Sequence, residues 1–194
     1  ISVIEKMGVK IACGVNVGED LTLQDLREQG YKAFYLAIGM QTGRKINISN
    51  EEYALNGVEF LNRVNHGQTD ILNGRTVVIG GGNVAIDVAR TAARINSSKT
   101  MMFCLESPKE MPADIQEVEE ALQEGVDINY GWGPHEIVVE NDKIKSMIFK
   151  RCIQVYDKDG HFHPIYNDTT TKEIPCDHIL LAIGQAPVFG HLLD

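Results

Sequence analysis

One stretch of the chain combines residue types and spacing that suit the binding of a dinucleotide. The strand-forming run Thr76-Val-Val-Ile79 leads directly into three glycines and then into a helical pattern. The spacing Gly80-x-Gly82-x-x-Ala85 fits the G-x-G-x-x-A form of the dinucleotide fingerprint. Gly80 allows a sharp turn, Gly82 lets a pyrophosphate approach the main chain, and Ala85 lets the helix pack against the strand. The N–H groups that begin the helix would face the phosphates.

The glycine spacing alone is weak evidence, because glycine-rich turns between a strand and a helix also occur without a ligand. Here a strand precedes the turn, a helix follows it, and a second apolar strand is expected near Thr100–Cys104. These neighbours indicate a βαβ unit and favour dinucleotide binding over a purely structural turn. The residues of the turn that we expect to contact the nucleotide are Gly80, Gly81, Gly82, Asn83, Val84 and Ala85.

Composition restricts the remaining classes of function. Hydrophobic residues make up 43% of the 194, and no apolar run approaches the roughly 20 residues of a membrane span. The net charge of −9 argues against nucleic acid or an anionic membrane as partner, because both attract clustered Lys and Arg. Four scattered cysteines include no C-x-x-C pair, so neither a redox disulfide nor an iron–sulfur ligand set is expected. We expect a cytoplasmic protein, and the initial Ile1 predicts an excised part of a longer chain.

The segments before the fingerprint predict few elements and no domain of their own. The expected elements are a helix ending at Gly8, a strand at 9–12, a helix at 23–29 capped by Thr22, and a strand at 33–38 closing on Gly39. Residues 40–56 are polar and are predicted to form a linker. An amphipathic helix is expected at 58–64.

The segments after the fingerprint predict an α/β domain of unusual composition. We expect a strand at 99–105, an acidic helix at 114–124 with Ile115, Val118 and Leu122 inward, and a third parallel strand at 126–130. Alternating segments at 136–140, 143–156 and 161–174 then predict an antiparallel β-meander in place of a crossover helix. A last buried strand at 178–183 ends on Gly184. The predicted fold is therefore Rossmann-like, with three layers, a parallel sheet and a meander.

The combined motifs resemble the flavoproteins with two dinucleotide-binding domains, and among them the small-subunit family of glutamate synthase. The resemblance covers nearly the whole chain and rests on Gly-Tyr-Lys-Ala-Phe-Tyr-Leu-Ala-Ile-Gly (30–39), the glycine turn and helix (80–92), Glu-Met-Pro-Ala (110–113) and Ile-Leu-Leu-Ala-Ile-Gly-Gln (179–185). It implies an FAD-binding domain split in sequence by an NAD(P)H-binding domain. Residues 1–56 would be the tail of the FAD domain and a linker, 57–184 the NAD(P)H domain, and 185–194 the return segment.

The same resemblance implies hydride transfer from NAD(P)H to FAD, and then electron flow to an iron–sulfur protein or a large synthase-type subunit. Gly39 and Gly184 would be paired hinge turns, and Ala182, Ile183 and Gly184 would lie near the nicotinamide. The alternative for these residues is a buried strand that ends in a turn. No residue of the chain is expected to be catalytic, because the flavin site would lie in the missing halves of the FAD domain and nothing here accepts a hydride. Alone, the chain should bind nucleotide and be inactive.

Leu105-Glu106 departs from the family pattern, which has two arginines that would pair with the 2′-phosphate of NADPH. A charged hydrogen bond contributes roughly 1.5–3 kcal/mol, so the loss of two favours NADH. Glu106 can also accept a hydrogen bond from the ribose 2′-OH. Lys109 could restore some phosphate binding, and in the alternative interpretation Glu106 points into solvent.

Other patterns are weaker. His161-Phe-His163 is a conceivable metal pair, but it has no third ligand nearby in sequence, which favours an exposed hairpin tip and no metal site. The acidic run Glu117, Glu119, Glu120 and Glu124 is predicted to be a solvated helix face. Alternative parent proteins are a pyrimidine dehydrogenase-like protein and an electron-bifurcating flavoprotein. A non-catalytic nucleotide-binding module is the alternative from a different class.

Overall fold

The computed structural model describes residues 1–95 and 97–193 and divides the chain into two compact units. The first unit comprises Ile1–Thr42 and Pro187–Asp194, and the second comprises Gly43–Ala186. Within the described residues, no helix combines the length and the apolar character that a bilayer crossing requires.

The first unit contains two short helices, α1 (Ser2–Lys6) and α2 (Leu23–Glu28). The predicted cap of α2 is confirmed, because Thr22 and Asp25 form a capping box with reciprocal hydrogen bonds of 3.1 and 2.9 Å. The strands predicted at 9–12 and 33–38 are wrong, since neither segment pairs with another strand of the described chain. Without a partner, a strand loses the ladder hydrogen bonds that stabilise it.

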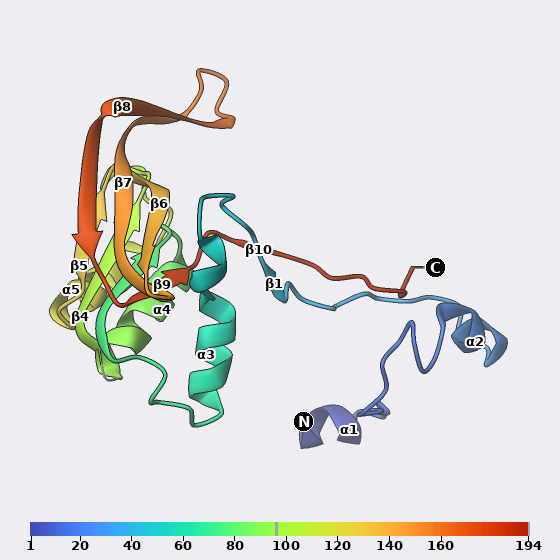
Figure 1. Ribbon diagram of the computed structural model, residues 1–194. Coiled ribbons are helices and arrows are strands. Elements are labelled where there is room, and N and C mark those ends of the chain that lie inside the picture. The colour runs from blue at the N-terminus through green and yellow to red at the C-terminus, as the bar shows by residue number, and fades with distance from the viewer. Residues whose placement is uncertain (96, 194) are drawn as a thin grey trace. The chain divides into compact units, whose positions relative to one another are not determined.

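The second unit is built on a parallel sheet that carries the glycine turn. Its strand order is β2-β9-β3-β4-β5, and every neighbouring pair is parallel. The strands are β2 (Leu55–Asn56), β9 (His178–Leu181), β3 (Gly74–Ile79), β4 (Ser97–Cys104) and β5 (Asp127–Tyr130). The helices of this unit are α3 (Gly57–Asn65), α4 (Asn83–Arg94) and α5 (Ile115–Gln123). Figure 1 shows α3 and α4 beside the sheet.

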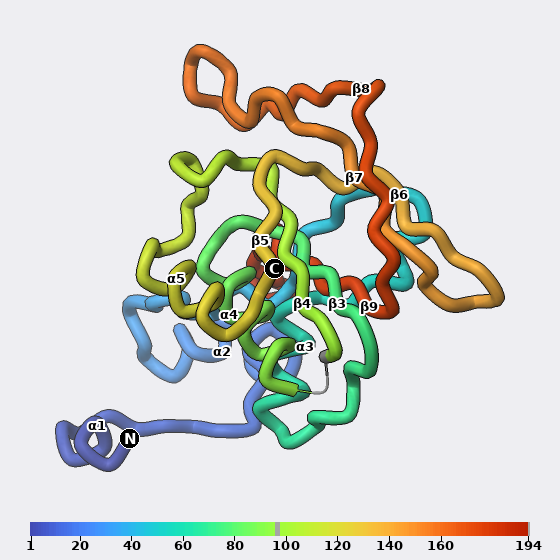
Figure 2. The backbone as a smooth tube through the Cα atoms, turned by 90° about the vertical axis from the view of Figure 1, so that its left-hand side faces the viewer, coloured from blue at the N-terminus to red at the C-terminus, as the bar shows by residue number. Residues whose placement is uncertain are grey.

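An antiparallel meander follows β5, as predicted. It consists of β6 (Trp132–Glu140), β7 (Lys143–Tyr156) and β8 (Phe162–Pro175), paired in that order. Asn141 and Asp142 join β6 to β7 with φ values of 52° and 57°, the left-handed conformation that tight hairpin turns require. Figure 2 shows β7 and β8 running together for most of their length.

Alternate residues of the sheet face two different cores. Val78 of β3, Met102 of β4 and Leu180 of β9 pack with the helices. Their neighbours Val77 and Ile179 pack against the meander together with Phe103 and Phe149, whose rings stack at 4.0 Å. The order of layers is therefore helices, parallel sheet and meander, and the predicted three-layer α/β fold is confirmed.

The linker predicted at 40–56 is wrong for residues 43–56, which belong to the second unit. This segment contains a 3₁₀ helix, η1 (Glu51–Tyr53), and β2 at the edge of the parallel sheet. Ile46 and Ile48 pack against the meander-side core, while the Glu51 carboxylate accepts hydrogen bonds from the Ile46 and Asn47 N–H groups. Two short strands, β1 (Thr42–Gly43) and β10 (Gln185–Ala186), pair where the chain enters and leaves this unit.

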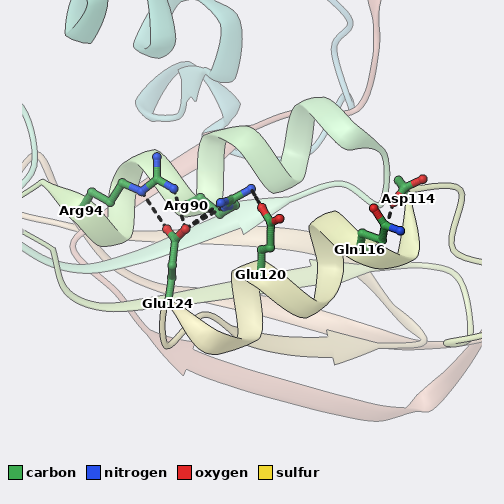
Figure 3. A network of polar contacts seen from close by, with 6 residues as sticks. All are labelled: Arg90, Arg94, Asp114, Gln116, Glu120 and Glu124. Carbon is green, nitrogen blue, oxygen red and sulfur yellow. Dashed lines mark hydrogen bonds and ion pairs between the residues drawn. The ribbon is translucent and has the colours of Figure 1, made fainter.

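The predicted orientation of the acidic helix is also wrong. Ile115 and Leu122 are 72% and 51% exposed, whereas Ala121 is fully buried and Val118 packs against the helix-side core. The reason lies in the charges, because Glu124 and the exposed Glu120 form ion pairs with Arg90 on α4 (Figure 3).

The contact between α4 and α5 is a network of charged side chains. Glu124 accepts hydrogen bonds from Arg90 Nε at 2.9 Å and from Arg94 Nε at 2.8 Å, and Arg90 Nη1 lies 2.7 Å from Glu120 Oε2. The bonds from Arg94 and Arg90 lower the pKa of Glu124 to about 2. This lowered pKa makes the ionised carboxylate a stabilising group above the pKa it has in the unfolded chain.

We expect Glu124→Gln to destabilise the protein at neutral pH by about 1 kcal/mol, because it removes the charge shared by both arginines. The difference in stability between the native protein and the variant should be fully present above the unfolded pKa of about 4.5. It should vanish as pH falls through about 2, where the native carboxyl takes up its proton. Denaturant unfolding of both proteins across this range measures it. Glu119→Gln, on the exposed side of the same helix, is the matched control. Equal destabilisation by both variants, or a stability difference that does not depend on pH, would contradict the stabilising role of the Glu124 carboxylate.

Candidate functional site

A cavity of about 620 Å³ opens at the carboxyl ends of β3, β4 and β9, all within the second unit. In parallel α/β sheets, this edge is where ligands bind. The lining residues come from Arg44–Ile46, Ile79–Val84, Phe103–Glu106, Pro112, Trp132, Pro134, Phe162, Pro164, Tyr166 and Ala182–Gly184.

The glycine turn between β3 and α4 has the close contacts that its spacing predicts. Gly80 has a φ of +148°, and a Cβ atom at this position would lie 2.3 Å from the Ala182 carbonyl oxygen and 3.0 Å from the Ala85 Cβ. Any side chain at Gly80 would therefore separate β3 from β9 and α4. Ala85 is fully buried behind the turn and does not line the cavity.

Gly82 differs from Gly80 because its missing side chain leaves open space. A Cβ atom there would have no heavy atom within 4 Å, and Gly82 is the N-cap residue of α4. The start of α4 therefore presents main chain, with no side chain over it, to the cavity. Such a helix start has N–H groups and a partial positive charge suited to an anion.

Glu106 lies inside the site and not in solvent, so the alternative that it points away is wrong. The residue is only 9% exposed, and its Oε2 would lie 2.6 Å from a Cβ atom at Gly81. The carboxylate thus rests on the main chain of the glycine turn. A side chain at position 81 would displace it, which explains a third glycine outside the fingerprint spacing.

The loop between β4 and α5 is fastened to the glycine turn. The Asp114 N–H donates to Asn83 Oδ1 at 2.8 Å, and the Ala113 N–H donates to the Gly81 carbonyl at 3.2 Å. Asp114 in turn caps α5 by accepting from the Gln116 N–H. The Asn83 side chain therefore holds the start of α5 against the turn. Lys109 is exposed in this loop and does not line the cavity.

The structure brings most of the predicted site residues together. Gly80, Gly81, Gly82, Asn83, Val84, Glu106, Ala182, Ile183 and Gly184 all line the cavity, whereas Ala85 and Lys109 do not. Sequence reasoning missed the contributions of Arg44 and Lys45, and of Trp132, Phe162 and Tyr166 on the meander. The alternation of Phe162, Pro164 and Tyr166 was visible in the sequence, but only the folded meander brings it to the glycine turn.

Positively charged side chains lie at and near the cavity, although the chain as a whole is acidic. Arg44 and Lys45 line it directly, and the Arg44 N–H donates to the Gly184 carbonyl at 3.1 Å. Two further cations lie near the lining residue Trp132 without lining the cavity themselves, with Arg151 Cζ 5.4 Å and Lys172 Nζ 5.6 Å from its ring centroid. These charges suit an anionic ligand.

Cys104 also lines the cavity, but its thiol is poorly suited to redox chemistry. Burial, and then the nearby Glu106 carboxylate, raise the pKa of Cys104 to about 12. All four cysteines are free thiols. A thiol that holds its proton at neutral pH is a weak nucleophile, so the site does not support dithiol exchange.

Of the two histidines singled out by the sequence, His161 lies in the turn between β7 and β8, and His163 lies near the start of β8. His161 and His163 are both exposed. His161 groups with Asp157 and Asp159, whose possible ligand atoms lie within 4.8 Å of one another, and His163 is not in this group. Asp157 Oδ1 already accepts the N–H groups of Asp159 and His161 at 2.9 Å, which is the bonding of a turn.

Comparison with known proteins decides the family. The pyridine nucleotide-disulphide oxidoreductase family matches residues 3–189. The chain belongs to this family. The glutamate synthase [NADPH] small chain of Halomonas elongata is 29% identical over 96% of this chain, and the predicted resemblance to that group of flavoprotein subunits is confirmed.

The chain is also similar to parts of other, longer proteins. It is 33% identical over 96% of its length to the NADP(+)-dependent formate dehydrogenase subunit beta of Moorella thermoacetica. It covers 27% of that relative and 42% of the glutamate synthase small chain. The structure of Mycobacterium tuberculosis FprA in complex with NADPH matches with a TM-score of 0.75 and 20% identity, over 90% of this chain and 54% of FprA. The last comparison confirms the fold.

We expect alkylation to separate one exposed thiol from three protected ones. Cys13 is exposed, whereas Cys104, Cys152 and Cys176 are buried, so iodoacetamide at about pH 8 should modify Cys13 more than about a hundredfold faster than the others. Mass spectrometry of digested samples gives the rate at each cysteine. Cys13→Ser should abolish the fast reaction, and denaturant should make all remaining thiols reactive. Rapid labelling of Cys104 in the native protein would contradict its assignment as an inert lining residue.

Proposed function

We propose that the second unit binds NADH or NADPH in the cavity and presents the nicotinamide to FAD held elsewhere in a larger flavoprotein. The observation that carries the proposal is the glycine turn, whose main chain faces the cavity at Gly82 with no side chain in front of it. The pyrophosphate would lie there, at the start of α4. When bound, the reduced nicotinamide supplies a hydride and FAD would accept it.

The residues of the chain would then orient the nucleotide. Glu106 would accept a hydrogen bond from the adenosine ribose, since it lies two residues after β4, the strand next to the fingerprint strand. Ala182–Gly184, at the end of β9, would border the nicotinamide, and Arg44 and Lys45 would add positive charge. We assign no proton transfer to any of these side chains.

Family membership supports a flavin-dependent parent for this chain. We propose that Gly43–Ala186 is its nucleotide domain and that the segments of the first unit belong to the FAD domain that encloses it in sequence. Electrons would pass from the flavin to an iron–sulfur protein or a large synthase-type subunit. In this scheme the isolated chain binds nucleotide and is inactive as an oxidoreductase.

A pyrimidine-reducing parent is the second candidate. The NAD-dependent dihydropyrimidine dehydrogenase subunit PreT of Escherichia coli is 34% identical over 74% of this chain, and the chain covers 34% of PreT. Reconstitution of the whole flavoprotein with uracil or with glutamine and 2-oxoglutarate as substrates distinguishes the two parents.

We expect Gly82→Ala to remove nucleotide binding while the fold persists. The added methyl group has space in the free protein, so stability should fall by less than about 1 kcal/mol. The same methyl group would occupy the place of the pyrophosphate, and affinity for NADH and NADPH should fall more than about tenfold. Quenching of the fluorescence of Trp132, the single tryptophan, provides the titration signal.

Gly80→Ala is the contrasting variant, because its methyl group would meet the Ala182 carbonyl at a left-handed position. It should lower stability by about 1–3 kcal/mol even without nucleotide. The proposal fails if neither nucleotide quenches the Trp132 fluorescence of the native chain. It also fails if the Gly82→Ala variant binds both nucleotides with the affinity of the native chain.

We expect NADH to bind more tightly than NADPH, because the Glu106 carboxylate would accept from a ribose hydroxyl and repel a 2′-phosphate. Two relatives of the chain carry NADP(+) or NADPH in their names. A preference for NADH would therefore differ from those relatives and would arise from residues of this chain such as Glu106. Glu106→Gln, of similar shape, should reduce the ratio of the two affinities about tenfold. Calorimetric titration at one salt concentration measures both constants, and Asp87→Asn on the exposed side of α4 is the charge control. Tighter binding of NADPH by the native chain would refute the assignment.

A further inference from the structure

The β7–β8 hairpin bends at a long bulge before it reaches the cavity. Lys150 pairs with Thr171, but the next residue of β7, Arg151, pairs with Asn167, so residues 168–170 of β8 have no partner on β7. Bulges bend strands and redirect the side chains beyond them. Figures 1 and 2 both show the distal part of the hairpin leaving the direction of the paired strands.

Polar contacts hold this bulge in one conformation. Asp168 Oδ1 lies 2.7 Å from Lys150 Nζ across the bulge. The Asn167 side chain accepts hydrogen bonds from the Thr169 N–H and hydroxyl at 2.9 and 2.7 Å. The bend is therefore stabilised by its own hydrogen bonds and ion pair.

Beyond the bend, one side of β8 faces the cavity. Phe162, Pro164 and Tyr166 alternate along the strand, and all three line the cavity, whereas Ile165 between them does not and is 44% exposed. Phe162 is the most exposed of the lining aromatics, at 62%, and its ring stands edge-on to Tyr156 at 6.2 Å. A large apolar ring left exposed at a cavity suits contact with a flat apolar ligand group.

The contacts of Tyr166 show at which end of the cavity this side of β8 lies. A Cβ atom at Gly133 would lie 2.3 Å from Tyr166 Cε1 and 2.8 Å from Leu105 Cδ2, so the tyrosine ring and Leu105 meet over Gly133. Leu105 precedes Glu106 at the end of β4. The other end of the cavity, at Ala182–Gly184, belongs to β9, and β3 lies between these two strands.

We propose that Phe162 and Tyr166 form the wall that binds the adenine ring, with Phe162 stacking on the base. This inference rests on the proposed function, because it names the protein groups that hold one half of the nucleotide. The base would extend from the ribose at Glu106 toward β8, away from the nicotinamide end. The hairpin of the meander thereby performs a binding role that the βαβ unit does not supply.

ADP-ribose tests the proposal because it carries the adenine, ribose and pyrophosphate but no nicotinamide. Phe162→Ala should weaken ADP-ribose and NADH by the same factor, about tenfold, since stacking of a base on an aromatic ring has that order of effect. Phe162→Trp should bind both within about twofold of the native chain. Ile165→Ala, on the opposite side of the same strand, should leave both affinities unchanged.

The possible outcomes separate this proposal from the proposed function. If the native chain binds neither ligand, the nucleotide site itself is refuted before any variant is made. If Phe162→Ala weakens NADH but not ADP-ribose, the ring contacts the nicotinamide half and the adenine wall is overturned. Unchanged affinities for both ligands, or an equal loss in Ile165→Ala, would also overturn it. Circular dichroism and thermal unfolding of each variant verify that the fold is retained.

Discussion

The close approach of three main-chain segments at Gly80 is the constraint on which the rest of the second unit depends. The position of a side chain at Gly80 is occupied by the Ala182 carbonyl at the end of β9 and by Ala85 on α4. Because nothing larger than hydrogen fits, β3, β9 and α4 meet at one point. That point sets where the carboxyl edge of the sheet opens, and therefore where a cavity forms.

The two faces of the parallel sheet have different tasks. The helix side buries small residues, such as Ala85, Ala89 and Ala92, so α4 lies close to the sheet and its start is held at the cavity. The meander side buries aromatic and sulfur-containing residues, among them Phe103, Phe149 and Met147. Strands β6 and β8 of this meander reach the edge of the sheet at which the cavity opens. The meander thus forms one wall of the cavity. A crossover helix at the same place in the chain would line the cavity with different side chains.

Local patterns predicted what depends on local contacts. The glycine turn, the Thr22 cap, the meander and its Asn141-Asp142 turn follow from residue types within a few positions of one another, and the structure has them all. The place of Glu106 at the cavity could be predicted for the same reason, since the residue closely follows a recognisable strand. The strand predicted at 33–38 failed because a strand also needs a neighbour, and a single segment carries no information on that.

The failures on α5 and at 43–56 have a related cause. An apolar periodicity would have turned Ile115 and Leu122 inward, but Arg90 and Arg94 on α4 attract the opposite edge of the helix through Glu124. Likewise, polar residues at 47–51 indicated a linker, although the Glu51 side chain accepts from the segment's own main chain and Asn50 Nδ2 donates to the Ile137 carbonyl on β6. Charge pairing between elements and hydrogen bonding within a segment both change which residues are buried, and neither has a periodic pattern in the sequence.

The placement of charge explains how an acidic chain can have a site for an anion. The net charge of −9 is distributed over the whole chain, but electrostatic effects at a cavity depend on groups within about a Debye length, roughly 8–10 Å. Arg44, Lys45 and the start of α4 contribute positive charge at the cavity wall. Glu106 is the acidic lining residue, and its carboxylate rests against Gly81 of the glycine turn, beside the start of α4. An uncharged ribose hydroxyl can donate a hydrogen bond to this carboxylate, whereas a 2′-phosphate beside it would be repelled.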